Sequence, residues 1–160
     1  MPHTRYPRNL EDAYRRRIVK LVYQWRKVAM DYFNVYMRDY FNGGTQIVAD
    51  APKNNPTETE QQNVLHNLDA MGYTIKQATS DATIRSIAEQ FVRTIDMFSY
   101  NNVAMQIRIA GINPIRNSPE LTKMFNARVA ENVQLIKYMK DRYADGITGV
   151  ISRAISNGDG

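Results

Sequence analysis

The sequence of 160 residues contains no cysteine, two histidines and one tryptophan. The absence of cysteine excludes disulfide bonds and thiolate metal sites, and the two isolated histidines, His3 and His66, argue against a histidine-rich metal site. No segment approaches the roughly 18 apolar residues that a membrane-spanning helix needs, and no signal-peptide-like apolar region begins the chain. We therefore expect a soluble protein that is made and used in a reducing compartment.

Sequence motifs of common enzymes are also missing. The chain has no GxxxxGK[ST], GxGxxG, HExxH or GxSxG motif, and no carboxylate and histidine cluster with ferritin-like spacing. The acids Asp81, Glu89, Asp96 and Glu131 are scattered in a way that is typical of solvated helix faces. We expect no enzyme activity, no cofactor and no metal site.

Helical periodicity is what the sequence does contain. Strand-like alternation of β-branched residues is almost absent, whereas ten tyrosines and five phenylalanines are spread along the chain. The mean hydropathy of −0.51 is low for a compact globule, although the length is that of one domain. These features predict an all-α protein, an elongated helical bundle of four or five helices, two of them long.

Turn and start signals divide the chain into segments. Asn9 is a candidate N-cap, Gly43-Gly44 ends the helix that follows it, and Thr57 with Glu60 forms a capping box. The predicted segments are an extended arm over residues 1–8 and a single helical domain over 9–160, made of a long basic helix (9–41), a loop (42–56) and a helical bundle (57–158).

An apolar seam runs along the helix predicted over residues 9–41. Its members recur every three or four residues, close to a heptad pattern: Tyr14, Ile18, Leu21, Trp25, Val28, Tyr32 and Tyr36. The seam must pack either within the bundle or against a neighbouring copy, and a long rod in a small protein favours the neighbour. The tyrosines Tyr32, Tyr36 and Tyr40 are spaced for packing rather than for a binding strip.

Three further helical stretches follow, and two of them contain a glycine that could interrupt them. The first carries Val64, Leu65, Leu68 and Met71 on one face, and Gly72 predicts a kink. The second covers about residues 80–109 and is predicted to stop at Gly111. The third begins at Ser118-Pro119, has an apolar face (Leu121, Met124, Phe125, Val129, Val133, Ile136 and Met139) and is predicted to weaken at Asp145-Gly146. A last short helix would turn Ile147, Val150, Ile151, Ala154 and Ile155 inward.

The positive charge is concentrated at the start of the chain. Residues 1–41 hold nine Lys and Arg and four acids, so this segment carries the whole net charge of +5. The candidate contact residues are Arg5, Arg8, Arg15, Arg16, Arg17, Lys20, Arg26 and Lys27, with Tyr6, Tyr14 and Tyr23 among them. Such side chains could contact nucleic acid, an acidic protein surface or solvent alone. Consecutive arginines spread over about 200° of a helix, so they do not form one reading edge.

Two segments in the second half of the chain resemble a known family. They are AGINPI (Ala110 to Ile115) and a helix with the sequence ENVQLIK (Glu131 to Lys137), followed by Arg153, Ala154 and Gly158. The pattern, with Asn101, Asn102 and Gln106 before it, resembles the phage Mu F-like head-morphogenesis proteins, also called minor head or minor capsid proteins. The resemblance covers about residues 80–160, whereas the basic N-terminal helix matches only in being helical.

The resemblance implies a structural protein of the phage virion. Such proteins are made in the host cytoplasm, are present in few copies, associate with the portal vertex and act in head assembly and in the passage of DNA. The implied partners are the portal protein, capsid proteins and phage DNA, with several copies in a ring-symmetric assembly. This chain has Tyr138-Met139-Lys140 where the family commonly has Ser and then an Ile-Pro pair. Family members usually continue beyond the glycine at 158, which leaves open that the chain is the N-terminal part of a longer protein.

Overall fold

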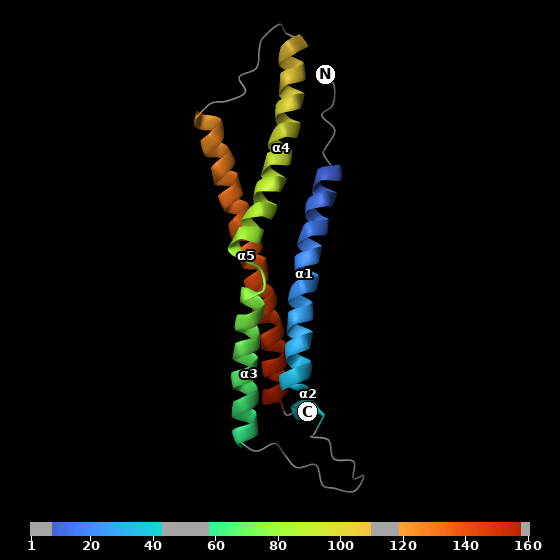
Figure 1. Cartoon of the computed structure of the whole chain (residues 1–160), viewed down its shortest axis with the longest axis vertical. Helices are drawn as coiled ribbons and strands as arrows, with labels where there is room; N and C mark the ends of the chain where they lie inside the picture. Colours follow the sequence, from blue (N-terminus) through green and yellow to red (C-terminus); the bar gives the residue numbers. More distant parts are fainter. Residues whose placement is uncertain (1–7, 43–57, 110–118, 158–160) are drawn as a thin grey trace. The chain divides into compact units, whose positions relative to one another are not determined.

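The computed structural model describes residues 8–42, 58–109 and 119–157, and only the backbone of residues 103, 104 and 106–109 (Figure 1). These described residues form helices and no strand. The five helices are α1 (Arg8–Tyr36), α2 (Arg38–Phe41), α3 (Glu58–Gln77), α4 (Asp81–Ile109) and α5 (Pro119–Ser156). The prediction of an all-α protein with four or five helices is confirmed. Most of the predicted arm and loop, together with Thr57, Gly111 and Ser118, lies outside the described residues.

The chain divides into two compact units. Unit 1 comprises Met1–Lys20 and Ser80–Tyr138, and unit 2 comprises Leu21–Thr79 and Met139–Gly160. Helices α1 and α5 contribute turns to both units, because each contains a boundary. The expectation of a single helical domain stays a prediction.

Unit 1 packs the beginning of α1 against α4 and the first half of α5. The ring of Tyr14 on α1 stacks on Phe91 of α4, with 4.0 Å between ring centroids, and its hydroxyl donates to Asn132 Oδ1 of α5 at 3.4 Å. The buried side chains of this unit lie on α4 and α5: Ile84, Ala88, Val92, Val129 and Ile136. Helix α4 begins after Ser80, whose Oγ accepts the backbone N–H of Thr83 at 3.1 Å as an N-cap.

Unit 2 is built around the only tryptophan of the chain. Trp25 of α1 is 1% exposed, and its Nε1–H donates to Thr79 Oγ1 at 2.8 Å. The indole also lies against the ring of Tyr143 of α5, with 5.8 Å between centroids. Met71 and Ile75 of α3 are fully buried in the same unit. The seam predicted on α1 is therefore buried most deeply at Leu21 and Trp25, whereas Tyr36 at its end is exposed.

Gly72 does not interrupt α3, contrary to the prediction of a kink. The residue is buried, and a Cβ atom added to it would lie 3.1 Å from Thr148 Cγ2 of α5. Glycine here allows α3 and α5 to approach closely, which is a packing role inside a continuous helix.

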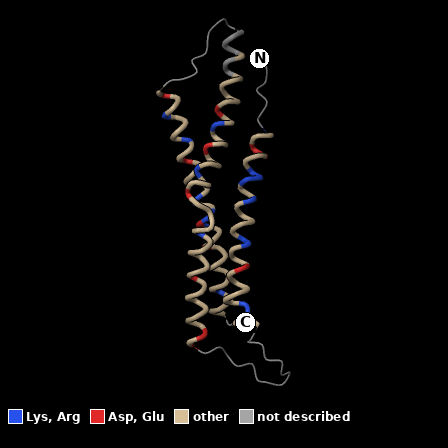
Figure 2. The backbone as a smooth tube through the Cα atoms, viewed as in Figure 1, with Lys and Arg blue, Asp and Glu red and all other residues tan. Residues whose placement is uncertain are grey.

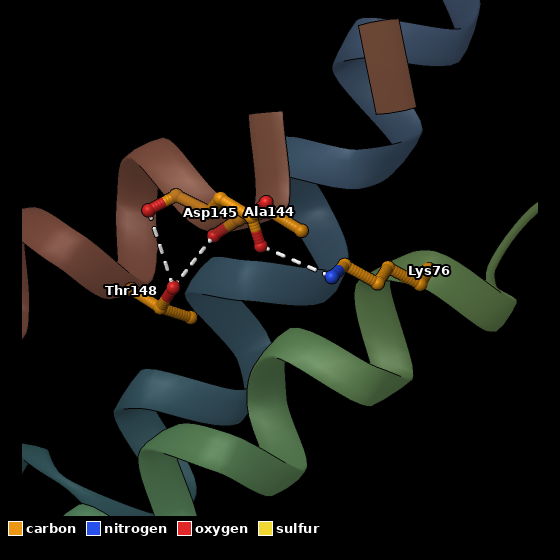
Figure 3. A network of polar contacts seen from close by, with 4 residues as sticks. All are labelled: Lys76, Ala144, Asp145 and Thr148. Atoms are coloured by element: carbon orange, nitrogen blue, oxygen red, sulfur yellow. Dashed lines mark hydrogen bonds and ion pairs between the residues drawn. The ribbon is translucent and has the colours of Figure 1, made fainter. Parts of the chain in front are cut away.

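Helix α5 also continues where the sequence predicted it to weaken. It runs through Asp145-Gly146 to Ser156 as one helix of 38 residues. Around this point Thr148 Oγ1 donates to the carbonyl oxygen of Ala144 at 3.0 Å, and Lys76 Nζ of α3 lies 3.0 Å from Asp145 Oδ1 (Figure 3). A glycine costs a helix about 1 kcal/mol, and burial of Ala144 and Ile155 on the same helix offsets a cost of this size.

The helix predicted over 9–41 is interrupted at Met37. The φ of this residue is −125°, far from the helical value of about −63°, and its side chain is fully buried. Eight residues of a straight helix rise about 12 Å, yet the rings of Phe33 and Phe41 are stacked with 5.5 Å between centroids. The backbone N–H of Met37 still donates to the carbonyl of Phe33 and that of Phe41 to the carbonyl of Met37, so the interruption is a bend that brings the ring of Phe41 against Phe33.

Several apolar residues predicted to face the core are exposed instead. Leu65 of α3 is 40% exposed, and Leu121 and Met124 at the start of α5 are 46% and 51% exposed. Val150, predicted to turn inward, is 58% exposed. Periodicity located the helices correctly, but it overestimated how much of each apolar face has a partner within the described residues.

Candidate basic contact surface

The predicted contact residues that belong to unit 1 lie on the first turns of α1. All five that the structure describes are exposed: Arg8, Arg15, Arg16, Arg17 and Lys20. Figure 2 shows the Lys and Arg positions along α1 in blue. We call these five residues the basic face. Arg5 lies outside the described residues, and Arg26 and Lys27 belong to unit 2.

The packing of Tyr14 decides which way the basic face points. Tyr14 is held between Phe91 and Asn132, and successive side chains are about 100° apart around the helix. Arg16 and Lys20 therefore point away from the side that Tyr14 occupies, whereas Arg17 lies next to that side, one turn after Tyr14. Arg16 and Lys20 are one turn apart and share one side of the helix, whereas Arg15 and Arg17 lie to either side of them. The structure thus brings Arg16 and Lys20 together and, as predicted, does not align all three arginines.

The basic face differs from other cations of unit 1 in its lack of ion pairs with described residues. Arg85 pairs with Glu89 at 2.9 Å, Arg128 pairs with Asp96, and Lys137 pairs with Asp81 at 3.2 Å. No residue of the basic face forms an ion pair with any residue that the structure describes. Its charge is therefore available to an external anion.

The two predicted contact residues in unit 2 have different surroundings. Lys27 Nζ forms an ion pair with Asp31 Oδ2 at 2.6 Å, so its charge is balanced locally. Arg26 is exposed and close enough to Tyr143 to act on its ionisation: burial raises the pKa of Tyr143, and the positive charge of Arg26 opposes that rise.

The aromatic residues among these cations do not form a stacking platform. Tyr14 is engaged with Phe91, and burial raises the pKa of its phenol. Tyr23 is 63% exposed, but it belongs to unit 2, and Tyr6 lies outside the described residues. Tyr32 and Tyr36 contact each other with 4.5 Å between ring centroids, as expected of a packing pair, whereas Tyr40 contacts Phe41. The basic face would therefore bind mainly through charge.

Acidic residues and His66 form no metal-binding group within the described ranges. Across residues 8–42, 58–109 and 119–157, no three His, Asp or Glu side chains are placed to hold a metal ion. Three of the four scattered acids, Asp81, Glu89 and Asp96, are in ion pairs, and His66 is exposed. None of the described helices is both long and apolar enough to cross a membrane.

Sequence reasoning missed one surface in unit 2. Ile147 and Ile151 were predicted to face inward, but they are only half-buried and line a groove together with Met30 and Phe33 of α1. The sequence of α5 did indicate such a surface, because the apolar residues cover more of the helix circumference than packing against two neighbouring helices requires.

Comparison with known proteins identified no relative. No family model matches the chain, and no curated protein or solved structure is significantly similar to it.

Proposed function

We propose that this chain is a structural phage virion protein, a minor head protein associated with the portal vertex or the inner capsid and involved in head assembly and in DNA packaging or ejection. The proposal rests on the resemblance of Ala110–Ile115 and Glu131–Lys137 to the phage Mu F-like head-morphogenesis proteins. Several copies would follow the ring symmetry of the portal vertex. The uninterrupted passage of α5 through Tyr138-Met139 is a difference from the helix break expected of that family.

The observation that supports a contact role is that no residue of the basic face forms an ion pair with a described residue. Exposed cations without a carboxylate partner attract phosphates or acidic protein surfaces from a distance of about one Debye length, roughly 8 Å at physiological salt. In a virion, the partner of such a face would be the DNA that passes the vertex or an acidic surface of the portal. The basic face is thus the part of unit 1 that we expect to touch a partner.

Mass spectrometry of purified particles tests the virion proposal. The particles are those of the phage whose genome encodes the chain, purified by density gradient and washed at high salt, with peptides of the major capsid protein as the internal standard. We expect peptides of this chain at a few copies per particle. Particles that are infectious but contain none of these peptides would contradict the proposal.

A second candidate function is a helical nucleic-acid-binding module, and the lack of described carboxylate partners for Arg15, Arg16, Arg17 and Lys20 favours it. Binding through these residues would release counterions, so affinity should fall by about 0.9 log units per log unit of salt for each phosphate contacted. Retention of duplex DNA in a gel-shift titration at low salt measures this effect.

Two triple variants separate charge from shape in that titration. Replacement of Arg15, Arg16 and Arg17 by Glu should abolish DNA retention, and replacement of the same three residues by Lys should preserve most of it. If the Glu variant retains DNA as well as the original chain does, the nucleic-acid-binding function is wrong.

A further inference from the structure

An open apolar groove lies between α1 and α5 within unit 2. It has a volume of about 280 Å³ and is lined mainly by Met30 and Phe33 of α1 and by Tyr143, Ile147 and Ile151 of α5. A second hollow of about 440 Å³ shares the three α5 residues and extends over Val150. Together these hollows form one apolar depression, which we call the α1/α5 groove. No residue of α3 lines it.

Apolar side chains on both sides of the α1/α5 groove are exposed. Met30 is 51% exposed and Val150 is 58% exposed on its two sides. A Cβ atom built on Gly146, which lines the second hollow, would have no other atom within 4 Å, so another chain has room to approach the α5 backbone there. Contiguous exposed apolar surface with a polar rim is typical of a protein interaction site.

The rim of the groove is basic. Arg26 lines the first hollow and Arg142 lines the second. Arg26 forms no ion pair with a described residue. A partner that fits the groove should therefore combine an apolar ridge with carboxylates.

The outward face of α3 has these properties in the same unit. Leu65, Asp69 and Tyr73 follow one another at intervals of four residues and so form one ridge along the helix. Leu65 is 40% exposed, Tyr73 is 68% exposed, and Asp69 lies exposed between them. Of the acids of α3, Asp69 lies on this ridge, and the one lysine of the helix is paired with Asp145. The α3 ridge is thus apolar and acidic, whereas the groove is apolar and basic.

We propose that the α3 ridge of one copy of this chain binds in the α1/α5 groove of a second copy. Helices pack by inserting the ridge of one into the groove of another, and the charges on the two surfaces are of opposite sign. A groove-to-groove dimer would instead bring the arginines of both copies into one interface, which like-charge repulsion disfavours. Because the two surfaces are different, the contact is heterologous and generates a closed ring or an open filament.

This contact deepens the proposed virion function, since it names the surfaces through which several copies would meet. Only the closure of the copies into a ring rests on that proposed function. The test of the contact uses the purified full chain in solution. Failure of self-association and absence from the virion can therefore be told apart.

Sedimentation velocity of charge-reversal variants tests the contact. The original chain should sediment faster as its concentration rises from the micromolar to the submillimolar range at low salt. Arg26→Glu and Asp69→Lys should each weaken self-association by about tenfold, because each converts an attraction into a repulsion. Lys123→Glu is the matched control, since Lys123 is exposed on the part of α5 that belongs to unit 1. Far-UV circular dichroism and Trp25 fluorescence check that every variant is folded.

Restoration experiments decide between the possible partners of the groove. The double variant Arg26→Glu, Asp69→Lys should regain self-association, and an equimolar mixture of the two single variants should associate more strongly than either does alone. If Arg26→Glu strengthens association while Asp69→Lys has no effect, a groove-to-groove dimer replaces the proposed contact. A chain that stays monomeric over the whole concentration range also overturns it.

Discussion

Unit 1 and unit 2 hold their described helices together by different kinds of contact. Unit 2 buries a tryptophan and large aliphatic side chains, and its indole N–H is satisfied by Thr79. The described core of unit 1 has no tryptophan, and its largest fully buried side chains are Ile84 and Ile136. Ion pairs lie at the surface of both units, such as Lys137–Asp81 in unit 1 and Lys76–Asp145 in unit 2. Exposed ion pairs contribute about 0–1 kcal/mol each, whereas burial of one large apolar side chain contributes about 1.5–3 kcal/mol. Both units therefore depend on their cores, and the core of unit 2 differs in being centred on an aromatic side chain with a buried hydrogen bond.

The largest expected effect is the loss of stability caused by a matched pair of core variants, one in each unit. Ile75 in unit 2 and Ile84 in unit 1 are both fully buried. Replacement of either by Ala should cost about 2–5 kcal/mol in the unit that contains it, through lost burial and a residual cavity. Trp25 is the only tryptophan and lies in unit 2, so urea denaturation followed by its fluorescence reports that unit. Ile75→Ala should shift this transition more than Ile84→Ala does.

Far-UV circular dichroism provides the control for that pair, because it follows helix loss in both units. Ile84→Ala should shift the circular dichroism transition more than it shifts the Trp25 transition. Equal shifts of both transitions by both variants would mean that the two units unfold as one, and the comparison between them would then lose its energetic basis.

The next effect concerns the hydrogen bond at the centre of unit 2. Thr79→Val replaces the hydroxyl that accepts the Trp25 Nε1–H, and it leaves a buried donor without a partner at a cost of about 1–3 kcal/mol. Urea denaturation followed by fluorescence measures the loss. Thr79→Ser keeps the hydroxyl and is the control, so it should be less destabilised than Thr79→Val. If Thr79→Val is as stable as the original chain, this hydrogen bond is not important to unit 2.

Much of the fold could be predicted from the sequence, because helix formation follows local patterns. The periodic apolar residues located α3, α4 and α5, and Ser80 was placed at the start of α4, where its hydroxyl caps the helix. The exposure of Arg16 followed equally from its position on a helix whose opposite side holds Tyr14.

The errors of prediction concern tertiary contacts and the continuity of helices, since α5 runs through Asp145-Gly146 as one helix. Gly72 was expected to interrupt α3 because glycine favours helix ends, but whether Thr148 of another helix approaches it cannot be read from neighbouring residues. Met37 carries no helix-breaking signal, yet the helix is interrupted there and its side chain is buried. The α1/α5 groove was missed because periodicity shows that a face is apolar and does not show whether another helix covers it.

Two glycine variants with opposite expected effects on stability test how closely the helices of unit 2 are packed. At Gly72 a new Cβ would lie 3.1 Å from Thr148 Cγ2, and Thr148 is held by its hydrogen bond to Ala144. Gly72→Ala should therefore destabilise the protein by about 1 kcal/mol through overpacking. At Gly149 the nearest contact would be 3.9 Å from Arg153 Nη1, so Gly149→Ala should stabilise the helix by about 0.5–1 kcal/mol. Thermal unfolding measures both, and an equal gain at both positions would contradict a close approach at Gly72.

The smallest expected effect is a pH dependence of the stability that Tyr14 contributes to unit 1. Burial raises the pKa of Tyr14 above its ordinary value of 10.0. In the unfolded chain the phenol ionises near pH 10, so the stability gained by keeping Tyr14 neutral is fully present below about pH 10. That stability is lost as the pH rises through the higher pKa of the folded state.

Tyr14→Phe isolates this contribution, because it keeps the ring that stacks on Phe91 and removes the ionisable hydroxyl. The raised pKa values of Tyr32 and Tyr143 in unit 2 remain in both proteins, so their effects cancel in the difference. The free energy of unfolding of the original chain minus that of Tyr14→Phe, measured by urea denaturation between pH 9 and 11, should decrease as the pH rises. A difference that stays constant over this range would mean that Tyr14 is as accessible to water in the folded chain as in the unfolded one, and the packing of α1 on Phe91 in unit 1 would then be wrong.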